Sequence, residues 1–166
     1  MANKYESAQL LLKLYEIRRE ETMRQARDWF IGFFPKSAQE IVDTLRGKDS
    51  SYYRMVVSYW DMAASFVNHD VIDEEMFNDT ILEHLAVFSK VQPNLTELRS
   101  LAGEPQYLKH LESLAMRTPN AEERLAQIRR RMKVFAASNE AAAIKQSLSS
   151  ASHSDSVALL AEDRKR

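Results

Sequence analysis

Cysteine is absent from this chain of 166 residues. Its absence excludes disulfide bonds, thiolate-bound zinc, iron–sulfur clusters and cysteine nucleophiles. A chain without cysteine suits a reducing compartment, and we expect the protein to be cytoplasmic.

Glycine and proline are scarce, with three glycines and four prolines. Helix interiors tolerate neither residue well, so a composition poor in both favours long helices over a loop-rich β protein. The same scarcity argues against the glycine-rich loops that hold phosphates and dinucleotides, and the G-x-S-x-G turn of many hydrolases is missing. We therefore expect no cofactor.

The chain also lacks a strong net charge and a long apolar run. A net charge of -1 gives no general attraction to nucleic acid or anionic lipid. The densest early apolar cluster, residues 29–34, is far shorter than the roughly 20 residues that span a bilayer. A membrane is therefore not an expected partner. The basic run at residues 129–133 lies in an amphipathic segment without interleaved aromatic side chains, so a nucleic acid is not an expected partner either.

What the sequence does contain is helical periodicity, strongest at residues 52–68. This segment is apolar or aromatic around most of a helix, so other helices must surround it. Capping residues, glycines and prolines divide the rest of the chain. The predicted helices cover residues 4–34, 37–47, 50–68, 73–93, 94–103, 105–117 and 118–135.

We therefore predict an all-α fold, a single bundle of about six or seven helices around the central helix. It begins with one long N-terminal helix that partly projects from the core. The bundle domain covers residues 1–135. Residues 136–166 are rich in alanine and serine, and we expect a loose tail that is flexible or a frayed helix.

Five polar residues interrupt the central helix at steps of four, three, four and three, which places them in one stripe. This polar stripe consists of Arg54, Ser58, Asp61, Ser65 and Asn68. It is either the solvent face of a mostly covered helix or the wall of a pocket. In the second case Arg54, Trp60, Asp61 and Asn68 form a candidate polar pocket for a small molecule or a reaction.

No catalytic or metal site stands out. Di-iron bundles place a glutamate three residues before a histidine, and no H-E-x-x-H zinc motif is present. The residues three before His69, His84 and His110 are Phe66, Ile81 and Tyr107. Ser65, Asp61 and His69 lie side by side on one helix, whereas a catalytic triad draws on separate elements. We predict no catalytic residues and no metal ligands, and favour a protein that is not an enzyme.

Charge is segregated along the chain. Between Arg54 and Lys90 there are several carboxylates and no lysine or arginine, whereas arginines and lysines gather near the last predicted helix. The candidate interaction patch consists of Arg124, Arg129, Arg130, Arg131 and Lys133. These side chains either contact the acidic segment, in the same chain or a second copy, or are simply solvated. We expect a homo-oligomer or a protein partner, and hence a non-catalytic interaction module.

The segment SYWDMAASFVNHDVIDEEMFND, residues 58–79, resembles a family of bacterial all-helical domains of unknown function. The matching positions are Trp60, Ala64, Asn68, Ile72, Asp73, Glu74 and Phe77. The resemblance extends over about residues 5–99 and implies an all-helical fold. It implies no activity or site. Several relatives carry a membrane anchor in the first helix; the first predicted helix here has no apolar run of that length, so we expect no membrane attachment.

Overall fold

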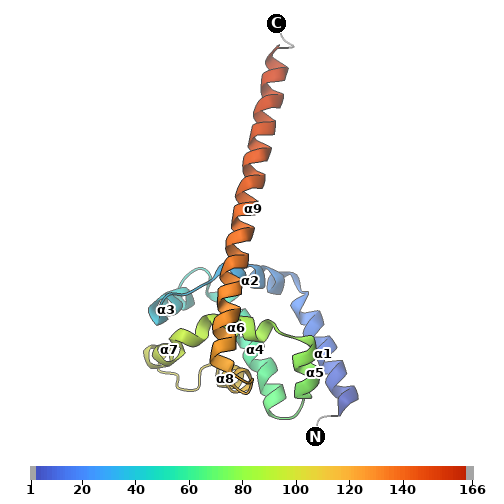
Figure 1. Cartoon of the computed structure of the whole chain (residues 1–166), viewed down its shortest axis with the longest axis vertical. Helices are drawn as coiled ribbons and strands as arrows, with labels where there is room; N and C mark the ends of the chain where they lie inside the picture. Colours follow the sequence, from blue (N-terminus) through green and yellow to red (C-terminus); the bar gives the residue numbers. More distant parts are fainter. Residues whose placement is uncertain (1–2, 164–166) are drawn as a thin grey trace. The chain divides into compact units, whose positions relative to one another are not determined.

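A computed structural model describes the backbone of residues 3–163 and the side chains of residues 3–146. The described backbone contains helices and no strand, so the all-α fold is confirmed (Figure 1). The elements are α1 (Lys4–Arg18), α2 (Glu21–Gly32), α3 (Ala38–Arg46), α4 (Ser50–Asn68), α5 (Glu74–Thr80), α6 (Glu83–Val91), the 3-10 turn η1 (Gln92–Asn94), α7 (Leu95–Ala102), α8 (Lys109–Met116) and α9 (Ala121–Asp163).

The chain divides into two compact units, Met1–Met132 and Lys133–Arg166. The first contains α1 to α8 and the beginning of α9, and the second contains the remainder of α9. The alanine- and serine-rich segment has a helical backbone as far as Asp163, and its last three residues lie outside the described part of the chain. No helix of the described residues is long and apolar enough to cross a membrane.

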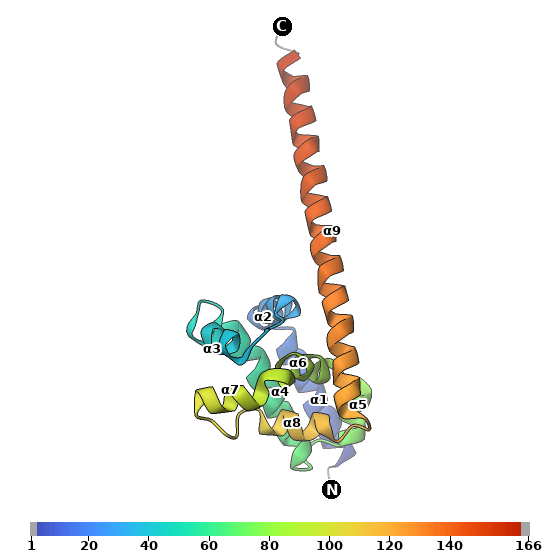
Figure 2. The ribbon, with the colours of Figure 1, turned by 60° about the vertical axis from the view of Figure 1, so that its left-hand side comes forward.

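The predicted central helix is the centre of the first unit. Val56, Trp60 and Ala63 of α4 are fully buried, and Phe66 is half-buried. Helices α2 and α8 contact α4 most extensively, while α3 and α6 contact it more locally (Figure 2). The apolar surface of α4 is nearly continuous, and these neighbours bury it. This burial accounts for the central position of the helix.

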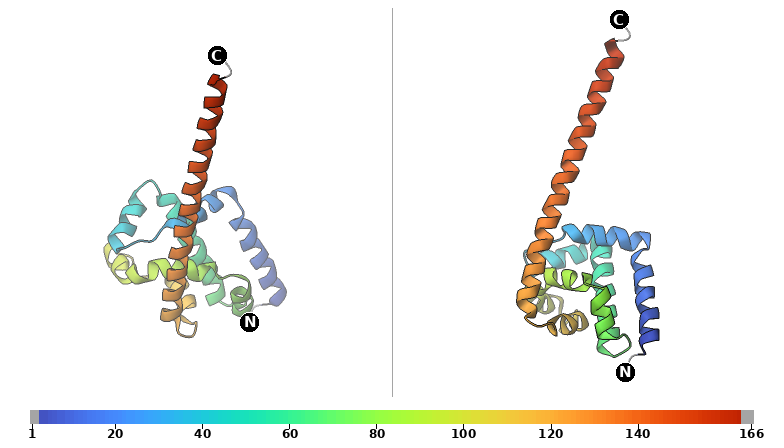
Figure 3. Two further views of the ribbon diagram at one scale, coloured as in Figure 1. Left: turned by 45° about the horizontal axis from the view of Figure 1, so that its top comes forward. Right: turned by 45° about the vertical axis from the view of Figure 1, so that its right-hand side comes forward.

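The predicted long N-terminal helix is wrong, because the chain turns sharply between α1 and α2 (Figure 3, right). Glu20 has an extended backbone, and its carboxylate accepts a hydrogen bond of 2.9 Å from the Met23 amide. Glu20 is therefore the N-cap of α2, and the interaction lowers the pKa of its carboxyl group.

The predicted helix 73–93 is also divided. Asn78, Asp79 and Thr80 are weak helix formers, and the backbone becomes extended at the buried Ile81. The following helix, α6, then begins at Glu83. The two breaks convert the seven predicted helices into the nine α-helices of the described residues.

Candidate functional site

Part of the polar stripe lines a groove between α4 and the segment that leads into α8. The groove has a volume of about 850 Å³. Its α4 wall includes Arg54, Ser58, Asp61 and Ser65, and the facing wall includes Tyr107. Arg54 and Ser58 are exposed, whereas Asp61 and Ser65 are half-buried. The stripe is thus solvent-facing at one end and becomes a helix–helix contact farther along α4.

Asp61 has a structural partner in α8. Its Oδ1 accepts a hydrogen bond of 2.9 Å from the Leu111 amide, in the first turn of that helix. The residue before α8, Leu108, has a left-handed backbone and provides no side-chain cap. Asp61 therefore satisfies a first-turn amide from a different helix, and its negative charge lies at the positive end of the α8 dipole.

Asn68 links α4 to α8 at the other end of the stripe. Its Nδ2 donates to the His110 carbonyl oxygen at 3.0 Å, and its Oδ1 accepts from Arg117 Nη2 at 2.8 Å. Arg117 also forms an ion pair of 3.0 Å with Glu74 of α5. Asn68 thus holds α8 and the residue after it against α4.

Trp60 lies away from this groove. Its ring is fully buried and stands edge-on to Tyr59, with the Arg18 guanidinium carbon 5.5 Å from its centroid. Of the four residues in the candidate polar pocket, only Arg54 and Asp61 line the groove. Asn68 is bonded to α8, and Trp60 belongs to the core.

The candidate interaction patch is divided between different environments. Arg129 donates a hydrogen bond of 2.7 Å to the Ser89 carbonyl oxygen of α6. Arg124 and Arg131 line a second groove, of about 580 Å³, together with Leu82, Leu85 and Ile128. Arg130 is exposed, and Lys133 belongs to the second compact unit.

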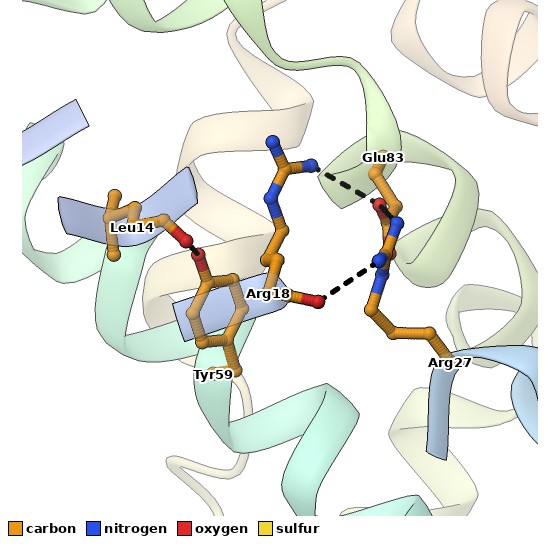
Figure 4. A network of polar contacts seen from close by, with 5 residues as sticks. All are labelled: Leu14, Arg18, Arg27, Tyr59 and Glu83. Atoms are coloured by element: carbon orange, nitrogen blue, oxygen red, sulfur yellow. Dashed lines mark hydrogen bonds and ion pairs between the residues drawn. The ribbon is translucent and has the colours of Figure 1, made fainter. Parts of the chain in front are cut away.

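Glu83 is the centre of an ion-pair network at the corner between α1 and α2 (Figure 4). Arg27 donates to both of its carboxylate oxygens, from Nε and Nη2 at 2.7 Å each, and Arg18 Nη1 lies 3.3 Å from Oε2. Arg27 also donates from Nη1 to the Arg18 carbonyl oxygen at 3.3 Å. The hydrogen bond to Glu83 raises the pKa of Arg27. Figure 4 shows that Tyr59 of α4 supports the same corner through a 2.7 Å hydrogen bond to the Leu14 carbonyl oxygen.

Lys90 is a buried cation, only 2% exposed. Its Nζ donates to the carbonyl oxygens of Phe30 and Ile31, at 2.6 and 2.8 Å, in the last turn of α2. The Phe34 ring centroid is 3.9 Å from the same nitrogen. Lys90 therefore caps the negative end of α2, and burial lowers the pKa of its ammonium group to about 7.

His84 is buried among aromatic rings, with Phe77 at 5.1 Å and Trp60 at 6.2 Å between centroids. Burial lowers the pKa of His84 to about 4, so the ring is neutral near pH 7. Among the described buried side-chain atoms, Arg18 Nε and Trp60 Nε1 lack a hydrogen-bond partner.

Helix α1 has apolar residues on two faces. Leu11 and Leu14 are buried on its inner face, whereas Tyr5, Leu12 and Tyr15 are 71, 61 and 52% exposed. Tyr5, Ala8, Leu12 and Tyr15 step by three, four and three residues and so follow one line along the helix. We call these four residues the outer face of α1.

Sequence reasoning did not identify Lys90 or the outer face of α1 as functional candidates. A signal for Lys90 was present, since it is the one lysine or arginine in α6 and closely follows the apolar run LAVF. A signal for α1 was the run QLLLKLY, which is apolar on more than one side of a helix.

Comparison with known proteins agrees with the resemblance that the sequence suggested. Residues 5–118 match the family described as a domain of unknown function (DUF4760). No curated protein and no solved structure matches the chain. Because the match covers more than half of its residues, the chain belongs to the DUF4760 family.

Proposed function

We propose that this protein is a non-catalytic helical module that associates with a second copy of itself through the outer face of α1. The observation that supports the proposal is the exposure of Tyr5, Leu12 and Tyr15 on a helix whose opposite side is already buried. Contiguous large apolar groups on a surface are typical of interaction sites. The family resemblance and the cysteine-free composition support a bacterial, cytoplasmic setting.

The spacing of the outer face suits an antiparallel helix pair. Steps of three and four residues are typical of a coiled-coil seam. In an antiparallel pair, a residue near the start of one helix packs against a residue near the end of the other. Such a pair places Tyr5 beside Tyr15 of the partner copy and Ala8 beside Leu12 of the partner copy. A parallel pair would instead place Ala8 against Ala8 and leave a gap. Size complementarity therefore favours the antiparallel arrangement, with a two-fold axis near residue 10.

The contact is small. Helix α1 has 15 residues and a length of about 22 Å. A single pair of helices of this length falls in the class of interfaces below about 1,200 Å², which are weak or transient. We therefore expect a dimer that dissociates on dilution.

A small-molecule or enzymatic pocket at the polar stripe is the competing proposal. Its support is the groove that Arg54 and Asp61 line together. It has less support than self-association, because Trp60 is in the core and Asn68 is engaged by α8. Asp61, its one acidic group, already accepts from the Leu111 amide.

Sedimentation velocity across a concentration series tests the self-association. The wild-type mass should rise from monomer toward dimer with concentration. Leu12→Asp places a charge in the seam and should keep the protein monomeric at every concentration. Val71→Asp is the matched control, because Val71 is an exposed apolar residue, 45% exposed, outside α1. This variant should dimerise as the wild type does.

Two results would contradict the proposal. One is a wild type that stays monomeric at the highest concentration reached. The other is a Leu12→Asp variant that still dimerises. Circular dichroism separates a loss of association from a loss of fold, and Leu12 is exposed enough that the fold should persist.

A further inference from the structure

We propose that a pocket between α2 and α6 binds a small carboxylic acid with an apolar body. The pocket has a volume of about 360 Å³ and lies apart from the outer face of α1. Residues of α2, α4, α6 and the beginning of α9 line it. They are Arg24, Arg27, Asp28, Phe30, Ile31, Val56, Glu83, Ala86, Val87, Lys90 and Met132.

The apolar part of the lining comes from several helices. Phe30, Val56 and Val87 are almost fully buried core residues, and Met132 adds a flexible apolar side chain. Ligand pockets in proteins combine such an apolar lining with a few placed polar groups. The body of the ligand should therefore be hydrocarbon.

The charged groups of the pocket favour an anion. Arg27 and Glu83 neutralise each other through two hydrogen bonds of 2.7 Å. Arg24 and Asp28 are opposite charges one helical turn apart on α2. The lining as a whole holds three cations and two carboxylates, which leaves one positive charge, and Lys90 is the fully buried cation among them.

Lys90 has no carboxylate partner among the described side chains. Its Nζ has three hydrogens, two of which are donated to the carbonyl oxygens of Phe30 and Ile31. These oxygens and the Phe34 ring carry only partial negative charge. A bound carboxylate would supply the full opposite charge that a buried ammonium group otherwise lacks. Burial lowers the pKa of Lys90 to about 7, and a bound anion would raise it again.

The volume limits the size of the ligand. At about 30 Å³ for each water-sized group, 360 Å³ holds about twelve non-hydrogen atoms. Octanoate is within this limit, whereas hexadecanoate exceeds it. Octan-1-ol has the same chain length as octanoate and no charge, so it tests the contribution of the carboxylate.

Isothermal titration calorimetry with octanoate tests the proposal. The wild type should bind octanoate at pH 6 at least tenfold more tightly than octan-1-ol or hexadecanoate. Ala86→Leu fills the pocket without removing a charge and should weaken octanoate binding at least tenfold. Lys90→Met removes the buried cation, and the folded variant should also bind octanoate at least tenfold more weakly. Arg46→Gln, which removes an exposed arginine that does not line the pocket, is the matched control and should bind as the wild type does.

The pH dependence gives an independent readout. Octanoate binding should weaken at least tenfold from pH 6 to pH 9, as Lys90 loses its charge. The other charged side chains that line the pocket with Lys90 are Arg24, Arg27 and Asp28 from α2 and Glu83 from α6.

The Leu12→Asp variant separates this proposal from self-association, since it should bind octanoate as the wild type does. The pocket is contradicted if the wild type does not bind octanoate, if octan-1-ol binds equally well, or if Ala86→Leu leaves the affinity unchanged. It is also contradicted if binding is lost only in Leu12→Asp, because the ligand then occupies the outer face of α1.

Discussion

Asp61 and His84 illustrate two ways in which a titratable side chain serves the fold. Asp61 stands in the polar stripe of α4, where the sequence suggested a pocket, and it caps α8 instead. His84 is buried in a neutral form among aromatic rings. The contribution of Asp61 to stability can be measured by mutation, and that of His84 by changing the pH.

Replacing Asp61 should lower the free energy of unfolding by the contribution of one helix-capping hydrogen bond. Asp61→Ala removes the acceptor of the Leu111 amide, so the free energy of unfolding should fall by about 1 kcal/mol. Ser58→Ala, in the exposed part of the same stripe, should change it by less than about 0.5 kcal/mol. Urea unfolding of the three proteins provides the comparison. A loss well above about 2 kcal/mol would instead indicate a larger buried network around Asp61.

His84 should make the protein sensitive to acid. Its pKa is about 4 in the folded protein against an ordinary 6.5, so the unfolded state binds more protons between these values. Stability contributed by the neutral ring is therefore present above pH 6.5 and declines as the pH falls toward 4, by up to about 3 kcal/mol.

The variant His84→Phe removes the titrating group and keeps a planar ring in the same aromatic cluster. Its free energy of unfolding should depend less on pH between 6.5 and 4 than that of the wild type, as measured by urea unfolding at each pH. Equal slopes for the two proteins would contradict this account of His84.

The helices differ in how well the sequence predicts them. The central helix α4 was predicted well, because its apolar surface is nearly continuous and requires burial by neighbours. The break at Glu20 was missed, because the charged residues around it are good helix formers and favour no particular stop. The cap by Asp61 was missed for a different reason: its partner, Leu111, is fifty residues away in the sequence.

The corner between α1 and α2 depends on Glu83 of α6. This carboxylate receives two hydrogen bonds from Arg27 and an ion pair from Arg18, and all three side chains are partly buried. Glu83→Gln keeps the shape and removes the charge, so the free energy of unfolding should fall by about 1–3 kcal/mol. A chemical denaturation curve measures the loss.

Glu75→Gln is the matched control, because Glu75 is an exposed glutamate of α5. It should change stability by less than about 0.5 kcal/mol. In a double-mutant cycle, Arg27→Gln and Glu83→Gln should show coupling, whereas Arg27→Gln and Glu75→Gln should be additive. Additivity in both cycles would mean that the network does not hold the corner.

The segregated charges of the chain are partly paired within the first unit. Glu83 is engaged by Arg18 and Arg27, and Glu74 by Arg117, so arginines outside the candidate interaction patch provide these partners. Pairing inside the fold leaves less of the acidic segment to contact a second copy. For this reason, the apolar outer face of α1 is the stronger basis for association of whole molecules.

The geometry of the proposed dimer can be measured directly, because the chain has no cysteine and a single introduced cysteine carries a unique spin label. In an antiparallel pair, Gln9 lies close to the two-fold axis. Glu16 lies about six residues from it, which separates the two copies of residue 16 by about 18 Å along the helix.

Pulsed electron–electron double resonance on spin-labelled Gln9→Cys and Glu16→Cys measures the distance between the two copies of each position. Both are exposed on α1, so a label should not disturb the core. We predict a short distance between labels at residue 9 and a distance longer by on the order of 10 Å at residue 16. Equal distances at the two positions, or no dipolar coupling between copies at either, would contradict an antiparallel association through α1.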